Sequence, residues 1–252
     1  MKKFAMAVVA AASLGTAFAD SCANSFTGFY AGVQAGMNST TGTLKAEGLF
    51  DTNLTTTTTT RNVNLGKKSF LGGLFVGYGM GVGSCAYVGA EFYGNFGNTG
   101  STLFDQTDDA GSNKFFKVSM SRKYNLGAKV RLGYTVSQQA MIFVGLGLEY
   151  AKTQLQVENI QSDAANPAAQ VGVTGVTKKN KGKISFAPSI GMDVFLNKNL
   201  FVRGEYTYVM GIKQTVTAAN GNIAGAAQAK TNANFKLNAS QQRFALGLGY
   251  KF

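Results

Sequence analysis

The charged residues with the most suggestive spacing are four acids and four bases, each set among small residues in short alternating segments. They are Glu91, Lys129, Arg131, Glu149, Asp193, Arg203, Glu205 and Arg243. If these charges share one narrow interior they must pair, because an unpaired buried charge is costly to desolvate. The set predicts a salt-bridged polar plug. An ion path through the same interior is the alternative.

Other signs of catalytic or ligand-binding chemistry are weak. The chain has no histidine, which removes the usual general base and most zinc sites, so we predict no enzyme, no metal and no cofactor. Alternating glycines from Gly77 to Gly83 suggest a nucleotide loop, but no Gly-Lys-Ser/Thr follows, and glycines facing a crowded interior explain them better. Asp105, Asp108 and Asp109 lack EF-hand spacing and are better interpreted as a solvated patch than as a Ca²⁺ site. We expect no nucleic acid partner.

The charges lie in segments of about ten residues where apolar residues alternate with small or polar ones, as in half-buried β-strands. In the first segment Phe29, Val33 and Met37 share one face, and Tyr30 and Gln34 the other. The faces that carry the charges are otherwise mainly Gly, Ala, Ser and Tyr, so the interior should be small and polar. We predict eight strands, near residues 28–38, 69–80, 87–96, 125–134, 141–151, 185–194, 200–208 and 243–252.

The connections alternate between long and short. Polar stretches near 39–67, 97–113, 153–182 and 211–231 alternate with turns near 81–84, 136–140 and 196–199. Long external loops and tight periplasmic turns are typical of outer-membrane barrels. A soluble lipocalin-like barrel would carry its charges outside. The pattern therefore predicts an all-β fold, an eight-stranded antiparallel transmembrane β-barrel with four long extracellular loops, centred near Thr57, Asp108, Asn166 and Gly221.

The N-terminus predicts export. Lys2 and Lys3 precede an apolar run and an Ala-Phe-Ala cleavage site that ends at Ala19. The apolar run is well below the ~20 residues that a membrane-spanning helix needs. We expect a signal peptide at 1–19 and a single barrel domain at 20–252.

The two cysteines, Cys22 and Cys85, should both lie on the periplasmic side. Because that compartment is oxidising, we predict a disulfide that ties the N-terminal segment to the barrel rim. Two separate free thiols are the alternative.

The chain ends in alternating apolar residues, Phe244, Leu246, Leu248, Tyr250 and Phe252. This resembles the C-terminal strand that outer-membrane assembly machinery recognises. The segment 28–36 resembles the first strand of opacity-type and OmpA-like small outer-membrane barrels. The resemblance covers essentially the whole mature chain and implies a multi-pass protein in the outer membrane of a Gram-negative bacterium.

The resemblance also implies a role, that of a surface protein which contributes to envelope integrity and presents variable loops. An opacity-like adhesin for host or environmental glycans or proteins is the first alternative. A narrow small-solute porin is the second, and it is disfavoured because porins with open channels have about sixteen strands.

The net charge of +12 is the last feature of the sequence that bears on function. The interior charges cancel, so the excess collects where strands lead to the long loops. This basic outer rim comprises Lys67, Lys68, Lys114, Lys117, Arg122, Lys123, Lys178, Lys179, Lys181 and Lys183, with Lys152, Lys213, Lys230 and Lys236 nearby. Attraction to an anionic membrane surface is roughly 1 kcal/mol per cation. The rim therefore predicts contact with lipopolysaccharide phosphates, and with acidic glycans in an adhesin. Solvated lysines that only extend the loops are the alternative.

Overall fold

The structure, a computed structural model, describes residues 25–50, 56–63, 68–97, 101–107, 114–158, 176–219 and 232–252. The predicted signal peptide and Cys22 lie outside the described residues. The elements within them are β1 (Gly28–Phe50), β2 (Thr56–Val63), β3 (Lys68–Val82), β4 (Ala86–Phe96), β5 (Ser101–Thr107), β6 (Lys114–Thr135), β7 (Ala140–Glu158), β8 (Val176–Phe186), β9 (Ser189–Phe195), β10 (Leu200–Ala219) and β11 (Asn232–Lys251). Among these residues there is no helix long and apolar enough to cross a membrane.

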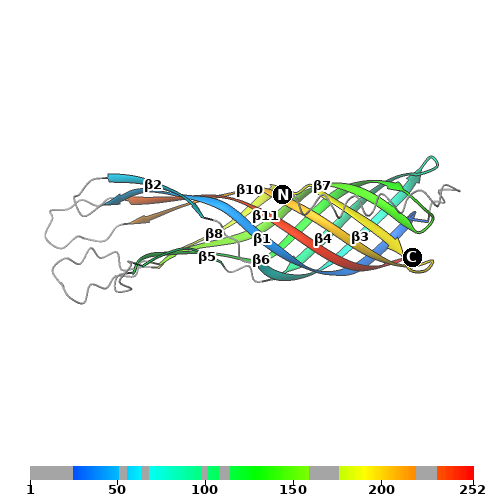
Figure 1. The fold of residues 1–252 in the computed structure, drawn as a ribbon, viewed down its shortest axis with the longest axis horizontal. Helices are drawn as coiled ribbons and strands as arrows, with labels where there is room; N and C mark the ends of the chain where they lie inside the picture. The colour runs from blue at the N-terminus through cyan, green and yellow to red at the C-terminus, as the bar shows by residue number, and fades with distance from the viewer. Residues whose placement is uncertain are drawn as a thin grey trace.

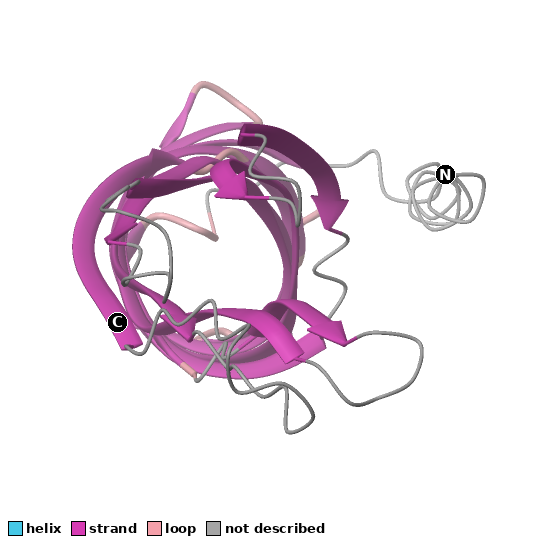
Figure 2. Ribbon diagram, turned by 90° about the vertical axis from the view of Figure 1, so that its left-hand side faces the viewer, coloured by secondary structure: helices cyan, strands magenta, loops and turns pink. Residues whose placement is uncertain are grey.

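The strands close into an eight-stranded antiparallel barrel, which confirms the predicted fold class (Figures 1 and 2). The wall runs β1-β3-β4-β6-β7-β9-β10-β11 and is sealed by pairing of the first strand with the last. That seal extends from Tyr30 opposite Lys251 to Glu47 opposite Asn234. β8 continues the wall strand of β9, since both pair with β7.

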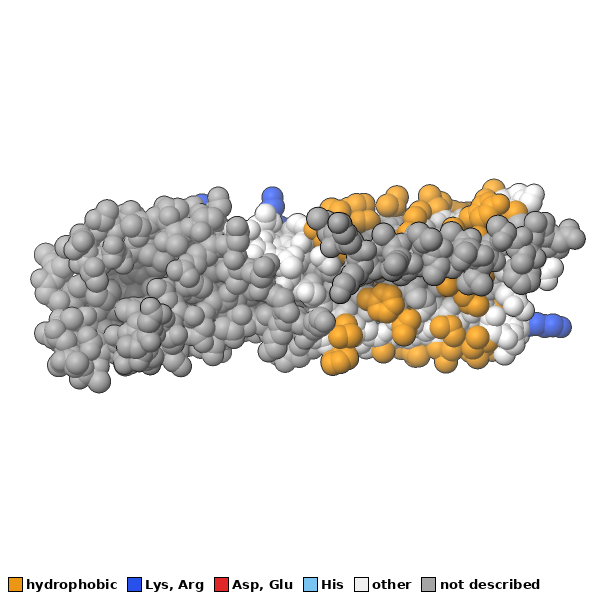
Figure 3. Space-filling model, in the orientation of Figure 1, with side chains coloured by type: hydrophobic (Ala, Val, Ile, Leu, Met, Phe, Trp, Pro, Cys, Tyr) orange, Lys and Arg blue, Asp and Glu red, His pale blue; other side chains and the backbone are white. Residues whose placement is uncertain are grey.

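The side chains alternate as the sequence predicts, with apolar residues outside. The outward faces carry Phe29, Phe70, Leu148 and Leu246, which are 63%, 78%, 58% and 57% exposed. Figure 3 shows such side chains gathered over the barrel half of the molecule. So much exposed apolar surface is stable only against lipid, because in water it would drive association. This apolar band marks the membrane-spanning part of the wall.

Short turns join the strands at one end, which we call the turn end. They lie at 83–85, 136–139 and 196–199. Gly83 has a φ of +64°, in the left-handed region that favours glycine, so the backbone of this turn explains the residue.

Beyond the apolar band the wall divides into two four-stranded sheets. One, the β1 arm, has the order β2-β1-β11-β10, and the other, the β6 arm, has the order β5-β6-β7-β8. No ladder joins β8 to β10 among the described strands, and the Tyr208 N–H donates to the Pro188 carbonyl (2.9 Å) where β9 gives way to β8. In Figure 1 the two arms extend from the barrel as separate branches.

These arms correct the predicted loop boundaries. Residues 39–50, 101–107, 153–158, 176–182 and 211–219 were expected in loops but are strands. The predicted loop centre Thr57 lies in β2, whereas Asp108, Asn166 and Gly221 lie outside the described residues. The physical reason is that apolar alternation is required only against lipid. The strands continue to pair beyond the membrane. There the alternation of apolar and polar side chains no longer indicates a strand, because water contacts the wall.

Candidate functional site

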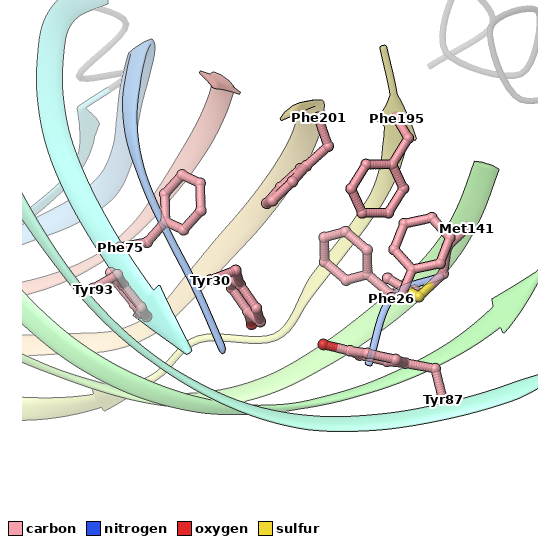
Figure 4. Packing of buried hydrophobic residues seen from close by; sticks show 9 residues of the cluster. Phe26, Tyr30, Phe75, Tyr87, Tyr93, Met141, Phe195 and Phe201 are labelled. Carbon is pink, nitrogen blue, oxygen red and sulfur yellow. The ribbon is translucent and has the colours of Figure 1, made fainter. Parts of the chain in front are cut away.

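The lumen at the turn end is filled by aromatic side chains. The aromatic cluster comprises Phe26, Tyr30, Phe75, Tyr87, Tyr93, Met141, Phe143, Phe195 and Phe201 (Figure 4). The Phe26 and Phe195 rings are 4.7 Å apart, and Phe201 meets Phe195 and Tyr30 edge-on at 5.6 and 6.0 Å. Edge-to-face and tilted arrangements at these separations are favourable. The predicted small, polar interior is therefore wrong at this end.

Inward glycines leave the room that the rings occupy. A Cβ on Gly79 would lie 2.0 Å from the Tyr87 hydroxyl oxygen, and one on Gly77 2.4 Å from that of Tyr30. On β11, a Cβ on Gly249 would lie 2.2 Å from the ring of Phe201 on the neighbouring strand. The alternating glycines of β3 thus accommodate large side chains from neighbouring strands. This interpretation accounts for the glycine run without a nucleotide.

The eight charged residues of the lumen lie next to this cluster in two groups of ion pairs, here together called the charge network. Glu91 is its centre: it accepts from Arg203 Nη1 (2.7 Å) and Arg131 Nη1 (3.4 Å), and its other oxygen forms an ion pair with Lys129 Nζ (3.0 Å). Asp193 binds both arginines, Arg131 through Nη2 (2.6 Å) and Arg203 through Nε (2.8 Å) and Nη2 (3.1 Å). Such forked arginine–carboxylate contacts fix both partners in one geometry.

A second part of the network lies toward the arms. Lys129 also binds Glu205, and both Nη atoms of Arg243 donate to one oxygen of Glu149 at 2.9 Å. The Tyr93 hydroxyl donates to the same Glu149 oxygen (3.3 Å). All eight charged residues are buried, with Lys129 the most exposed at 7%. The charges come from β4, β6, β7, β9, β10 and β11, so the network braces most of the wall.

The arginines connect the network to the aromatic cluster. The guanidinium carbon of Arg131 lies 3.7 Å from the centre of the Phe143 ring, and that of Arg203 lies 4.3 Å from the Phe75 ring. A cation over a ring face is attracted by the ring quadrupole, most strongly where water is excluded. The Tyr30 hydroxyl donates to Glu91 at 2.9 Å. Rings and charges therefore pack as one continuous plug.

Amide side chains line the lumen beyond the charges. Gln34 donates to Asn95 (2.6 Å) and Asn95 to Asn125 (2.8 Å). A cavity of about 10 Å³ lies beside Asn95, Asn125 and Gln241, which is room for about one water.

The predicted assembly signal lies on the outer face of β11. Phe244, Leu246, Leu248 and Tyr250 are 46% to 57% exposed, and the terminal Phe252 is 74% exposed. The Phe252 N–H donates to the Phe29 carbonyl (2.9 Å), so the chain end is tied to the first strand.

The predicted disulfide involves one described residue. Cys85 is not a free thiol in the structure. Its predicted partner Cys22 lies outside the described residues, so the pairing stays a prediction.

The basic outer rim lies mainly on the β6 arm. Lys114, Lys117, Arg122 and Lys123 belong to β6, and Lys178, Lys179, Lys181 and Lys183 to β8. Lys68 begins β3, and Lys67 lies outside the described residues. The structure corrects the expected placement at strand ends, because both groups lie within strands that flank β7. The acidic residue Glu158 is opposite Lys117 on the backbone ladder of β6 and β7.

Comparison with known proteins agrees with this architecture. The structure of OprG from Pseudomonas aeruginosa matches with a TM-score of 0.51 at 14% identity, covering 90% of this chain and 96% of that one. Ail of Yersinia pestis, solved with the heparin analogue sucrose octasulfate, matches with a TM-score of 0.42 at 12% identity, covering 90% and 100%. Neisserial surface protein A matches with a TM-score of 0.41 at 13% identity, covering 90% and 98%.

No curated protein sequence matches the chain. The family model described as outer membrane protein beta-barrel domain matches residues 4–252. The match and the OprG-like fold indicate a Gram-negative outer-membrane protein whose strands cross the membrane several times. In barrels of this kind the short turns are periplasmic, so we expect the turn end in the periplasm and the arms outside the cell. The chain belongs to the family of outer membrane protein beta-barrel domains.

Proposed function

We propose that this protein is a surface barrel of the outer membrane that stabilises the envelope and passes no solutes through its lumen. The observation that carries the proposal is the continuous plug of aromatic cluster and charge network. An eight-stranded barrel is just wide enough for side chains to fill, and here large rings and paired charges fill it. We propose no catalytic role, since the chain has no histidine.

Opening this lumen would require several costly steps at once. Glu91 would have to leave three cations, and Asp193 two, while all of them remain buried. Separating a buried charge from its partner leaves it uncompensated, at a cost of about 3–5 kcal/mol. This cost disfavours the narrow porin as an alternative.

The second part of the proposal concerns the basic outer rim, which contacts lipopolysaccharide phosphates. The basic groups of β6 and β8 belong to the extracellular arm and flank the same strand, β7. Each cation contributes roughly 1 kcal/mol of attraction to an anionic lipid surface, so several together bind lipid phosphates of the outer leaflet. Neutralising Lys178, Lys179, Lys181 and Lys183 together should weaken binding of lipopolysaccharide or heparin, more at low salt than at high salt. Lys198→Gln at the opposite end is the control, since this lysine is exposed in a periplasmic turn.

A role in adhesion is the second candidate function. The observation that favours it is the pair of arms, which carry paired strands beyond the apolar band and so provide a rigid surface for a partner. A deletion strain separates the candidates when it is tested for detergent sensitivity and for adhesion to glycan-coated surfaces. The envelope role predicts detergent sensitivity that the wild-type gene reverses. Loss of adhesion with unchanged detergent resistance would instead support the adhesin and contradict the envelope role.

A further inference from the structure

The outer wall carries a groove of about 730 Å³ where β1, β10 and β11 run side by side. Its lining side chains are Thr41, Thr43, Tyr208, Met210, Asn238 and Ser240. The hydroxyls of Thr41 and Ser240 are 3.3 Å apart, so two adjacent strands present a joint polar edge. Tyr208 and Met210 add an aromatic and an apolar surface from the third strand. The groove is therefore amphipathic, and it faces away from the lumen.

A β-bulge in β10 creates the hollow. Pairing with β11 shifts register between Val209 and Ile212, and both of these side chains are buried, at 0% and 5% exposure. Gly211, between them, has a φ of +73°, and a Cβ added there would meet no atom within 4 Å. A bulge bends its strand and interrupts the ladder locally. The bulge therefore leaves open space beside Gly211.

The groove lies at the height where the apolar band ends. Met37, Met210 and Phe244, which are 39%, 40% and 52% exposed, are the last large apolar outward side chains described on their three strands. Threonine, serine and asparagine side chains line the next positions. In Figure 3 the orange band likewise gives way to white polar surface. This is the level at which acyl chains end and headgroups begin in the outer leaflet.

Two lysines flank the groove on the side away from the membrane. Lys213 pairs with Asn238 on the β10–β11 ladder, and Lys236 lies two residues further along the same face of β11. Both side chains are exposed. A ligand that enters the groove therefore meets apolar surface on its membrane side, hydroxyl and amide groups in the middle, and positive charge on its outer side.

We propose that this groove binds one molecule of the phosphorylated, acylated glucosamine lipid of the outer leaflet, the lipid A part of lipopolysaccharide. Its acyl chains lie against the apolar band, its sugar hydroxyls face Thr41, Asn238 and Ser240, and one phosphate lies between Lys213 and Lys236. The inference rests on the proposed contact with lipopolysaccharide and adds a defined site on the β1 arm. The site adjoins the basic groups of the β6 arm, because Lys183 Nζ donates to the Lys213 carbonyl (3.4 Å).

Native mass spectrometry of the detergent-solubilised barrel with added lipid A tests the site. The wild-type protein should retain one lipid A, and lipid A without its phosphates should bind more weakly. Lys213→Ala with Lys236→Ala should weaken binding about 25-fold, from about fivefold per lysine. Ser240→Trp, which fills the groove, should abolish the one-to-one complex.

Matched controls lie elsewhere on the barrel. Lys198→Ala removes an exposed cation in the turn at 196–199, and Leu126→Trp adds an indole to the lipid-facing wall of β6. Both control variants should bind as the wild type does. Folding of every variant is checked by its heat-dependent gel mobility, so that binding of lipid A is compared only among folded proteins.

The outcomes separate the groove from the rim. If folded Ser240→Trp binds lipid A fully, or if the control variants lose binding equally, lipid A does not bind in the groove. Equal retention of phosphatidylglycerol and lipid A would overturn the proposed ligand. Loss of lipid A only on neutralising Lys178, Lys179, Lys181 and Lys183 would overturn the groove and leave the proposed function standing. No lipid A retained by any variant or by the wild type would contradict both.

Discussion

The pair of Glu149 and Arg243 offers a quantitative test of the charge network. Glu149 is fully buried and Arg243 is 3% exposed, and two donor atoms of the arginine lie 2.9 Å from one carboxylate oxygen. Arg243→Met keeps most of the side-chain volume but removes the charge, and Glu149→Gln keeps the shape of the acid. The double variant removes both charges and leaves neither partner ionised.

The expected cost of each single change follows from burial. Removing one partner of a buried pair costs about 3–5 kcal/mol, since the other charge stays buried and uncompensated. For Arg243→Met we expect the lower end of that range, because the Tyr93 hydroxyl still donates to Glu149. The double variant should cost about 1 kcal/mol or less, since replacing a whole buried pair by neutral groups is often nearly neutral. The coupling free energy, the sum of the two single costs minus the cost of the double variant, should therefore be about 5 kcal/mol or more.

The assay is equilibrium unfolding in guanidinium with the barrel in lipid vesicles, followed by far-ultraviolet circular dichroism. The free energies of unfolding of the wild type, both single variants and the double variant complete the cycle. Lys198→Met is the control, because this lysine is exposed in a periplasmic turn and should contribute under about 0.5 kcal/mol. Additive single changes, with no coupling between Glu149 and Arg243, would refute the pairing.

Three further predictions concern the wall and the N-terminus. Gly36→Ala should destabilise the barrel by about 1–3 kcal/mol in the same unfolding assay, because its Cβ would lie 2.2 Å from a carbonyl oxygen of β11. Gly72→Ala is the control and should be neutral, since a Cβ there would meet no atom within 4 Å. Mass spectrometry of unreduced mature protein should find Cys22 and Cys85 joined, and alkylation of both thiols would end that idea. Amino-terminal sequencing of the mature protein should begin directly after Ala19, and an intact N-terminus would contradict the predicted signal peptide.

The spanning part of the fold was predictable because lipid enforces it. Outward positions such as Phe29 and Leu246 must be apolar, whereas inward positions need not be. Alternation with a period of two residues therefore identifies the membrane-spanning strands directly. Even in the predicted strand 69–80, whose residues after Ser69 are apolar, aromatic or glycine, Phe70 and Leu74 lie outside. The arms were missed because their strands lie in water, where no face has to be apolar.

The site was predictable in part for the same reason. Their positions on the inward face of each strand identified the eight charged residues that the structure brings together. The sequence could not identify which charges pair, because the pairing depends on the stagger between neighbouring strands. The aromatic cluster was missed although its signal was present. Phe75, Phe143 and Phe201 fall on the inward parity of their strands, opposite glycines of neighbouring strands such as Gly191 and Gly249. Large inward rings beside inward glycines are the pattern to seek in other small barrels.

Planar-bilayer recording of the purified barrel tests the closed lumen most directly. We expect no steady openings larger than those of a narrow, mostly closed barrel in the wild type. Arg203→Ala removes contacts to both Glu91 and Asp193 and should raise the conductance, whereas Lys198→Ala in the turn should leave it unchanged. Steady, large openings in the wild-type protein would contradict the account.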